Sequence, residues 1–318
     1  METPYLSIVV PVYNEESNLR PLLERLYPVA VNTGKPFEII LTNDGSKDHS
    51  LEIMRGMINE YPCLKVIEFN GNFGQHMAIL AAFERCSGDI VITLDADLQN
   101  PPEEIPRLVA EIEKGYDVVG TIRRKRQDSP FRKMASRIVN VTTNKMTGMR
   151  MNDYGCMLRA YHRNVIENIN RCGESTTFIP ALAQTFASNP AEIEVAHAER
   201  VEGESKYSLY KLIRLNFDLM TGFSVVPLQL FALFGIMTSI LSLVFAMFLL
   251  IRRFIVGAEV EGVFTLFAIL FFFIGIIIMG IGIVGEYVGR IYQEVRKRPR
   301  FVVRKTYGFG EDVNGNSR

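Results

Sequence analysis

Ile90-Val91-Ile92-Thr93-Leu94-Asp95-Ala96-Asp97-Leu98-Gln99 joins an apolar run of strand character to two aspartates and an amide. Hard cations such as Mg²⁺ and Mn²⁺ prefer oxygen ligands, and proteins often hold them with one or two carboxylates plus substrate phosphates. We therefore interpret Asp95, Asp97 and Gln99 as a metal-diphosphate site. The alternative is a solvated turn between a strand and a helix, since two aspartates at this spacing are common.

Apolar runs alternate with amphipathic stretches on both sides of this motif. The pattern predicts strands over Leu6–Val12, Phe37–Thr42, Leu64–Phe69, Ile90–Leu94 and Asp117–Thr121. It predicts helices over Ser17–Val29, His49–Glu60, Gln75–Arg85 and Pro102–Lys114. Such alternation indicates an α/β fold with a mostly parallel, Rossmann-like sheet covered by helices.

Polar loops follow four of the predicted strands. They are Tyr13–Glu16, Asn43–Ser46, Asn70–Gly74 and Asp95–Gln99. Ligands of open α/β sheets bind outside the carboxyl ends of the strands. We therefore expect these loops to form one rim, with His76 as a candidate contact beside Gly74 and Gln75.

Composition excludes some classes of protein and favours a membrane protein. The formal net charge of the 318 residues is zero, so overall electrostatics give no support for a nucleic-acid partner. The four cysteines lack the spacing of a zinc site, and we interpret them as reduced thiols. The hydrophobic fraction of 48% is high, and much of the excess lies in the last third of the chain.

Two long segments, Val225–Ile251 and Val263–Val284, contain no charged residue. Each exceeds the roughly 20 residues that cross a bilayer. Buried core helices are the alternative. Lysines and arginines before the first segment and after the second outnumber Arg252 and Arg253 between them, which predicts that both termini are cytoplasmic.

The resulting domain organisation has four parts. Residues 1–204 form a cytoplasmic α/β domain, and residues 205–224 form an interfacial amphipathic helix, because aromatic and aliphatic residues there interleave with basic ones. An ordinary linker helix is the alternative for that segment. Residues 225–284 hold the two spans, and residues 285–318 form a cytoplasmic juxtamembrane helix and tail, with the end after Tyr307 expected to be disordered.

Several motifs carry a resemblance to a known family. Three of them together resemble the nucleotide-sugar signature of family 2 inverting glycosyltransferases with the GT-A fold: Pro11-Val12-Tyr13-Asn14-Glu15, Asn43-Asp44-Gly45-Ser46 and Asp95-Ala96-Asp97-Leu98-Gln99-Asn100-Pro101-Pro102. A fourth, Arg200-Val201-Glu202-Gly203-Glu204-Ser205-Lys206-Tyr207, resembles a motif of the polyprenyl-phosphate branch, which includes dolichyl-phosphate mannose synthases. The resemblance extends to about Tyr307.

Within that branch the chain looks most like the enzymes that transfer 4-deoxy-4-formamido-L-arabinose from its UDP conjugate to undecaprenyl phosphate. The segments that carry this likeness are Asn72–His76, Gly120–Arg123 followed by Arg126–Ser129, and Asp153–Tyr161. The likeness implies a role in lipid A modification and polymyxin resistance at the bacterial inner membrane, with Mg²⁺ or Mn²⁺ as cofactor and a homo-oligomer, expected to be a tetramer. Related enzymes use glucose or amino sugars, so another sugar is the alternative.

The resemblance also implies which residues contact the donor. They are Pro11, Tyr13, Glu15, Asp44, Gly74, Gln75, Asp95 and Ala96. Many relatives carry two acidic residues in the second loop, whereas this chain has Asn43 before Asp44. Only Asp44 can therefore supply negative charge there.

The chemistry of the transfer needs positive charge at both phosphates. A metal on Asp97 would act as a Lewis acid on the leaving UDP. The acceptor, a phosphate monoester that is largely a dianion, needs fixed cations rather than a base. The candidates for this phosphate are Arg123, Arg126, Arg159, Arg200 and Lys206, with Ser205 from the family motif. A solvated surface charge or a structural ion pair is the alternative for each arginine.

Asp153 completes the predicted catalytic set with Asp97 and Arg200. Its position resembles that of the acceptor-side aspartate of the family, where it would act as a base or orient the sugar. Capping of a turn is the alternative, because Asp is a common turn residue.

Two other classes of protein compete with this interpretation. A processive polysaccharide synthase normally carries an acceptor motif with Trp, and this chain has no Trp. A non-catalytic scaffold or flippase subunit would not need the Asp95-Ala96-Asp97 motif, and two spans without charge provide no polar pathway for a sugar.

Overall fold

The computed structural model describes residues 3–123, 156–172, 178–195, 226–256, 263–296 and 298–309. These residues fall in two compact units. The first unit comprises the described residues up to 195 together with 298–309. The second comprises 226–256 and 263–296.

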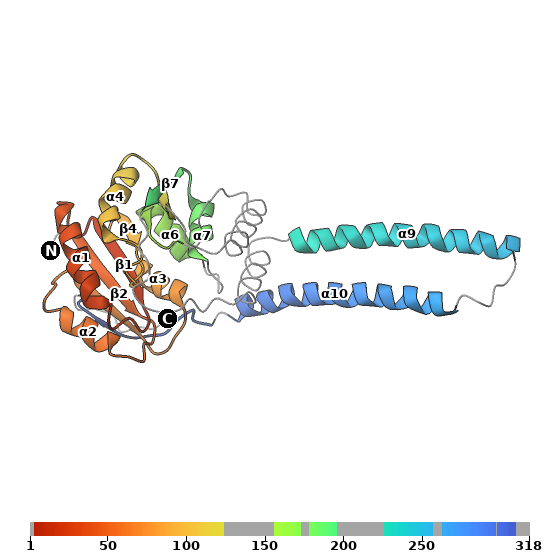
Figure 1. The fold of residues 1–318 in the computed structure, drawn as a ribbon, viewed down its shortest axis with the longest axis horizontal. Helices are drawn as coiled ribbons and strands as arrows, with labels where there is room; N and C mark the ends of the chain where they lie inside the picture. The colour runs from red at the N-terminus through yellow and green to blue at the C-terminus, as the bar shows by residue number, and fades with distance from the viewer. Residues whose placement is uncertain are drawn as a thin grey trace. The chain divides into compact units, whose positions relative to one another are not determined.

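The first unit is built on an eight-stranded mixed sheet (Figure 1). Its strands are β1 (Leu6–Val12), β2 (Phe37–Asn43), β3 (Leu64–Phe69), β4 (Ile90–Thr93), β5 (Val118–Arg123), β6 (Arg159–His162), β7 (Pro190–Val195) and β8 (Val303–Tyr307). Their order is β7-β5-β6-β4-β1-β2-β3-β8. The pairs β1-β2, β1-β4, β2-β3 and β5-β7 are parallel, whereas β4-β6, β5-β6 and β3-β8 are antiparallel.

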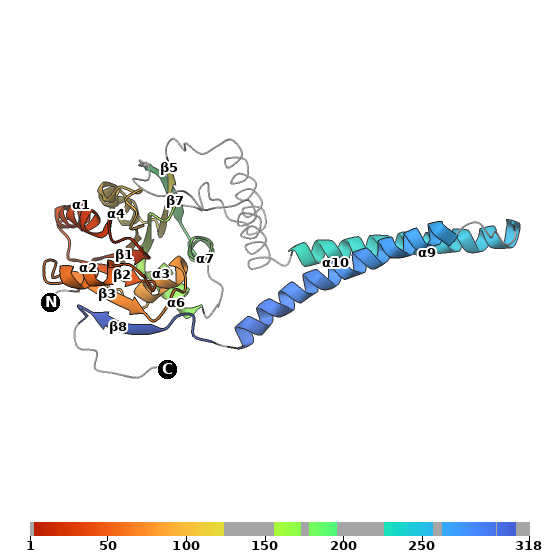
Figure 2. The same cartoon turned by 60° about the horizontal axis from the view of Figure 1, so that its bottom comes forward.

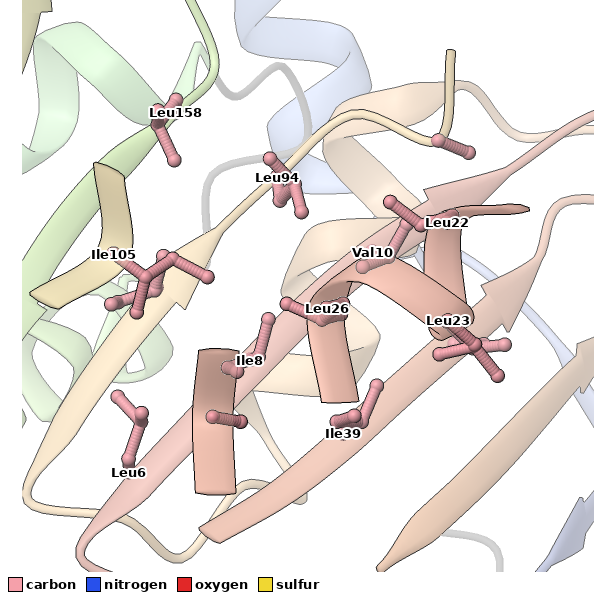
Figure 3. Close-up of a cluster of buried hydrophobic side chains, with 14 of the residues drawn as sticks. Leu6, Ile8, Val10, Leu22, Leu23, Leu26, Ile39, Leu94, Ile105 and Leu158 are labelled. Atoms are coloured by element: carbon pink, nitrogen blue, oxygen red, sulfur yellow. The ribbon is translucent and has the colours of Figure 1, made fainter. Parts of the chain in front are cut away.

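Helices cover both faces of this sheet. They are α1 (Leu19–Asn32), α2 (Ser50–Met57), α3 (Gln75–Phe83), the 3₁₀ turn η1 (Pro102–Glu104), α4 (Ile105–Glu113), α6 (Arg163–Arg171) and α7 (Ile179–Phe186). Side chains alternate along each strand. As a result, Ile8 and Val10 pack with α1 and α4 (Figure 3), whereas Val9 packs with α3 in a second core on the other face.

The predicted elements agree with this architecture. The strands over Leu6–Val12 and Leu64–Phe69 are confirmed to the residue, and the mostly parallel α/β fold is confirmed. The helix predicted over Pro102–Lys114 is divided into η1 and α4. The helix predicted over His49–Glu60 ends at Met57. A turn follows it, in which the Glu60 N–H donates a hydrogen bond to the Met57 carbonyl.

Strand β8 was not predicted, because a juxtamembrane helix and tail were expected for residues 285–318, and Val303–Tyr307 within that range is a strand. It lies along β3 (Figure 2) and pairs with it in antiparallel fashion, with Val66 opposite Tyr307. The hydroxyl of Tyr307 donates a 2.8 Å hydrogen bond to the Glu68 carboxylate. The antiparallel pairing with β3 and the bond from Tyr307 to Glu68 therefore place this segment in the sheet of the first unit.

The second unit consists of two long helices, α9 (Val226–Val256) and α10 (Val263–Val295). They approach closely at Gly280 of α10, where a Cβ atom would collide with the ring of Phe231. Small residues allow such close packing of apolar helices. Within the described residues one segment, Phe272–Tyr292, is long and apolar enough to cross a membrane, with a mean hydropathy of 2.0.

Candidate functional site

The parallel central strands bring the predicted rim together. Val12 of β1 lies opposite Asn43 of β2, and the N–H of Asp44 donates a 2.9 Å hydrogen bond to the Val12 carbonyl. Val9 of β1 lies opposite Thr93 of β4, so the aspartate motif begins at the same edge of the sheet. The loops after β1, β2 and β4 therefore meet there, as the sequence predicts.

The loop after β1 is held in place by side chains that bond to the backbone. The N–H of Asn14 donates to Oγ of Ser46 at 3.0 Å, and Oδ1 of Asn14 accepts from the N–H of Lys47 at 2.7 Å. Asn14 adopts a left-handed conformation with φ of 56°, which asparagine tolerates better than most residues. The turn leaves the side chain of Tyr13 exposed at the rim.

Glu15 and Pro11 flank this turn. The N–H of Glu15 donates to Oγ of Ser50 at 3.0 Å, and its carboxylate accepts a 2.6 Å bond from Asn18. Pro11 lies within β1 opposite Thr42. Both residues therefore have fixed backbones at the edge where we expect the donor.

Asp44 organises the loop after β3. Its carboxylate accepts hydrogen bonds from the N–H of Phe73 at 2.6 Å and from the N–H of Gly74 at 2.9 Å. Burial raises the pKa of Asp44, and these two N–H groups act against the rise. In this structure both carboxylate oxygens bind that loop, so a direct contact of Asp44 with the donor stays a prediction.

Gly45 permits this arrangement. It has φ of +68°, and a Cβ atom there would lie 2.5 Å from the carbonyl carbon of Gly71. The loops after β2 and β3 thus cross so closely at Gly45 that no side chain fits there. Asn72 supports the crossing with a 3.2 Å bond from Nδ2 to the Asp44 carbonyl.

Asp95 lies between two side-chain amides. Nε2 of Gln75, the first residue of α3, donates to Oδ1 of Asp95 at 2.6 Å, and Nδ2 of Asn100 donates to Oδ2 at 3.2 Å. Ala96 is buried against the core. Leu98 adopts φ of 60°, and non-glycine residues in this region are found disproportionately at functional sites.

Asp97 is the predicted metal ligand. Its Oδ1 accepts from the N–H of Gln99 at 3.1 Å, and its side chain is partly exposed. Among the described residues no cluster of three or more His, Cys, Asp or Glu side chains could hold a metal alone. Proteins usually hold Mg²⁺ with one or two carboxylates plus substrate phosphates, so the metal role of Asp97 stays a prediction.

Of the predicted acceptor residues, Arg159 is described with its side chain. It is fully buried at the start of β6, and its Nε donates a 2.9 Å hydrogen bond to the Cys156 carbonyl. Burial, and secondly the charge of Arg159, lower the pKa of His76 to about 4. The ring of His76, which is therefore neutral near pH 7, meets Phe178 edge to face.

The other predicted acceptor and catalytic residues are placed less completely or not at all. Arg123 ends β5. The side chain of Arg123 lies outside the described part of the chain. The backbone and side chain of five further residues also lie outside it: Arg126, Asp153, Arg200, Ser205 and Lys206. The interfacial helix expected over 205–224 also lies outside it. The roles of these residues stay predictions.

Several residues that hold this rim were not predicted to have a role. They are Asn14, Ser46, Ser50, Asn72 and Asn100. A usable signal was present, because Asn and Ser after strands often bond to nearby backbone groups.

Comparison with known proteins places the chain among sugar transferases. A family model described as glycosyl transferase family 2 matches residues 7–169. Several relatives carry the name undecaprenyl-phosphate 4-deoxy-4-formamido-L-arabinose transferase. The relative from Serratia proteamaculans is 52% identical over 317 residues, covering 98% of this chain and 96% of its own. The relative from Proteus mirabilis is 52% identical over 306 residues, covering 95% and 94%.

Solved structures of glucosyl-3-phosphoglycerate synthase from Mycobacterium tuberculosis share the fold. The complex with Mn²⁺, uridine diphosphate and phosphoglyceric acid superposes with a TM-score of 0.52 at 18% identity, covering 69% of this chain and 76% of that chain. The complex with Mn²⁺, uridine diphosphate and glucosyl-3-phosphoglycerate gives 0.51 at 17%, covering 69% and 78%. This likeness confirms the GT-A fold, and the family match and the relatives together show that the chain belongs to glycosyl transferase family 2.

Proposed function

We propose that this chain transfers 4-deoxy-4-formamido-L-arabinose from its UDP conjugate to undecaprenyl phosphate, a step of lipid A modification that gives polymyxin resistance. The observation that carries this proposal is 52% identity over 98% of the chain to a relative named for that transfer. The loops after β1, β2, β3 and β4 support it, because their polar residues come together at the edge of the sheet where open α/β sheets bind nucleotide donors.

The donor diphosphate would need a divalent cation. Asp97 would hold Mg²⁺ or Mn²⁺ with help from Asp95 and Gln99, and the cation would stabilise the charge of the leaving UDP. The rigid turn at Asn14 would fix Tyr13 and Glu15 for the nucleoside. Asp44 would then shape the donor pocket through the loop that ends at Gly74.

The acceptor phosphate would reach the rim from the membrane. Residues 225–251 and 263–284 would span the inner membrane, both termini and the active site would be cytoplasmic, and the helix over 205–224 would lie in the interface. Large apolar side chains along α9 and α10 are exposed, as expected for contact with lipid. Arg200 and Lys206 would bind the phosphate, and the chain would form a homo-oligomer, expected to be a tetramer.

The transfer would invert the anomeric centre. A phosphate dianion is already a nucleophile, so one displacement needs neither a covalent sugar-enzyme intermediate nor a strong base. Asp153 would orient the sugar. A second candidate is the same reaction with glucose or an amino sugar, because related enzymes with similar cores use those sugars.

Release of UDP tests whether the chain is an enzyme. Full-length protein in detergent, given the UDP-sugar and undecaprenyl phosphate, should release UDP only when both substrates are present. Release without the lipid would indicate hydrolysis, and no release with intact UDP binding would favour a scaffold.

A further inference from the structure

Behind the aspartate motif lies a buried chain of polar side chains that links it to β6. Asn100 is 3% exposed, and its Nδ2 donates to the Asp95 carboxylate while its Oδ1 accepts from the thiol of Cys156 at 3.5 Å. The hydroxyl of Thr121 lies 2.9 Å from Sγ of Cys156 and 2.7 Å from the Leu158 carbonyl oxygen. Buried polar groups at such distances are paired because an unpaired one is costly.

The donors and acceptors along this row of buried side chains can be assigned. A carboxylate only accepts hydrogen bonds, so Asn100 must turn its amide nitrogen toward Asp95. The amide oxygen then faces the thiol, which is a donor. If the amide turned over, two acceptors would face each other at Asp95. Asp95 and Cys156 therefore favour the same orientation of Asn100, the one that binds the carboxylate.

Cys156 also touches the acceptor side of the site. Its carbonyl accepts the 2.9 Å bond from Nε of Arg159, and the carbonyl of the next residue, Met157, accepts a 2.5 Å bond from the hydroxyl of Thr93. Thr93 is the last residue of β4, two positions before Asp95. The segment that carries the thiol is thus bonded to the strand that carries the motif and to the buried arginine.

We propose that Asn100 and Cys156 are positioning residues for the sugar transfer, with Asn100 fixing the carboxylate of Asp95 and Cys156 acting through Asn100. The inference rests on the proposed function, because it assumes that Asp95 belongs to the donor site. When a residue that hydrogen-bonds to a metal ligand and orients it is lost, metal affinity or activity typically falls about 10- to 100-fold.

The test measures UDP affinity of the full chain by calorimetry with Mn²⁺ present, and so does not depend on which sugar is transferred. Asn100→Ala should weaken UDP binding about 10- to 100-fold. Cys156→Ala should weaken it, and Cys156→Ser should bind more tightly than Cys156→Ala, since its hydroxyl remains a donor. The control is Asn170→Ala, because Asn170 donates a 2.9 Å bond to the Phe83 carbonyl away from the rim. It should bind UDP like the wild type.

The double variant Asn100→Ala with Cys156→Ala is the decisive one. If Cys156 acts through Asn100, the double variant should bind UDP no more weakly than Asn100→Ala alone. Additive losses, or an Asn100→Ala affinity equal to that of Asn170→Ala, would overturn the proposal. If Asn100→Ala does not fold, equal UDP affinity of Cys156→Ala and the wild type would overturn it. Failure of the wild type to transfer sugar while it binds UDP would instead refute the proposed function.

Discussion

Phe301 stacks on Phe69, with ring centroids 5.2 Å apart and 13° between the ring planes. Phe69 also meets Phe73 edge to face at 5.6 Å, and the N–H of Phe73 donates to the Asp44 carboxylate. A residue that follows α10 in the chain is therefore connected, through two aromatic contacts, to the loop at the predicted donor rim.

Removal of this stack should loosen that loop. Phe301→Ala should lower the free energy of unfolding by about 2 kcal/mol. Phe301 is half-buried, and the loss of a fully buried phenylalanine ring would lower the free energy of unfolding further. Hydrogen exchange should become faster at the amides of Phe73 and Gly74. The neighbouring Val302→Ala, whose side chain is 42% exposed, is the control and should change neither. Unchanged exchange in Phe301→Ala would show that Phe301 does not support the rim.

Gly45→Ala should be much more harmful than Gly34→Ala. Both glycines have φ near +67°, so both variants carry a similar backbone strain of about 1 kcal/mol or more. Gly34 has open space around it, whereas a Cβ at Gly45 would meet the backbone of Gly71 and Asn72. Thermal unfolding and UDP calorimetry should therefore both show a larger loss at Gly45. Equal effects would mean that the close crossing of the two loops is unimportant.

His76 should make the fold less stable in acid. Its pKa is about 4 in the folded chain, and an unfolded histidine has an ordinary pKa near 6.5, so below that pH the unfolded chain binds a proton that the folded chain does not. The free energy of unfolding should fall by about 3 kcal/mol as the pH drops from 6.5 to 4. In His76→Gln this part of the pH dependence should disappear. Urea unfolding of both proteins across that range measures it, and an identical pH dependence of the two would contradict the lowered pKa of His76.

Much of the first unit could be predicted because its signals are local. Strands β1, β2, β3 and β4 are apolar runs flanked by polar loops, and their parallel order places those loops at one edge. Strands β6, β7 and β8 were not predicted. They are short and partly charged, so they lack the apolar runs that identify the first four strands. Strand β8 also pairs with a strand more than two hundred residues earlier, as the bond from Tyr307 to Glu68 shows, and no local pattern predicts such a pairing.

The site divides in the same way. The residue types at the rim could be predicted, but their division of labour could not. Asp44 and Asp95 look alike in sequence, yet one binds backbone N–H groups and the other binds two side-chain amides. Asn100 and Cys156 lie 56 positions apart, and only the pairing of β4 with β6 brings them together.

Asp97→Asn should abolish turnover while the fold is retained. Loss of one charge at the predicted metal ligand should reduce the rate at least about 100-fold, because Lewis-acid stabilisation is worth several kcal/mol. A chelator should inhibit the wild type equally, and Mn²⁺ or Mg²⁺ should restore it. The control is Glu103→Gln, since the pair of Glu103 with Arg25 at 2.9 Å is exposed and contributes little. Full wild-type activity in excess chelator would refute the metal assignment.

Product analysis with competing donors tests the proposed transfer most directly. The full chain should be incubated with undecaprenyl phosphate and equal amounts of the UDP conjugates of 4-deoxy-4-formamido-L-arabinose, glucose and N-acetylglucosamine, and the lipid product identified by mass spectrometry. We predict a product whose mass increase corresponds to formamido-arabinose, with inverted anomeric configuration by NMR. A glucosyl or N-acetylglucosaminyl lipid as the main product, or retained configuration, would contradict the account.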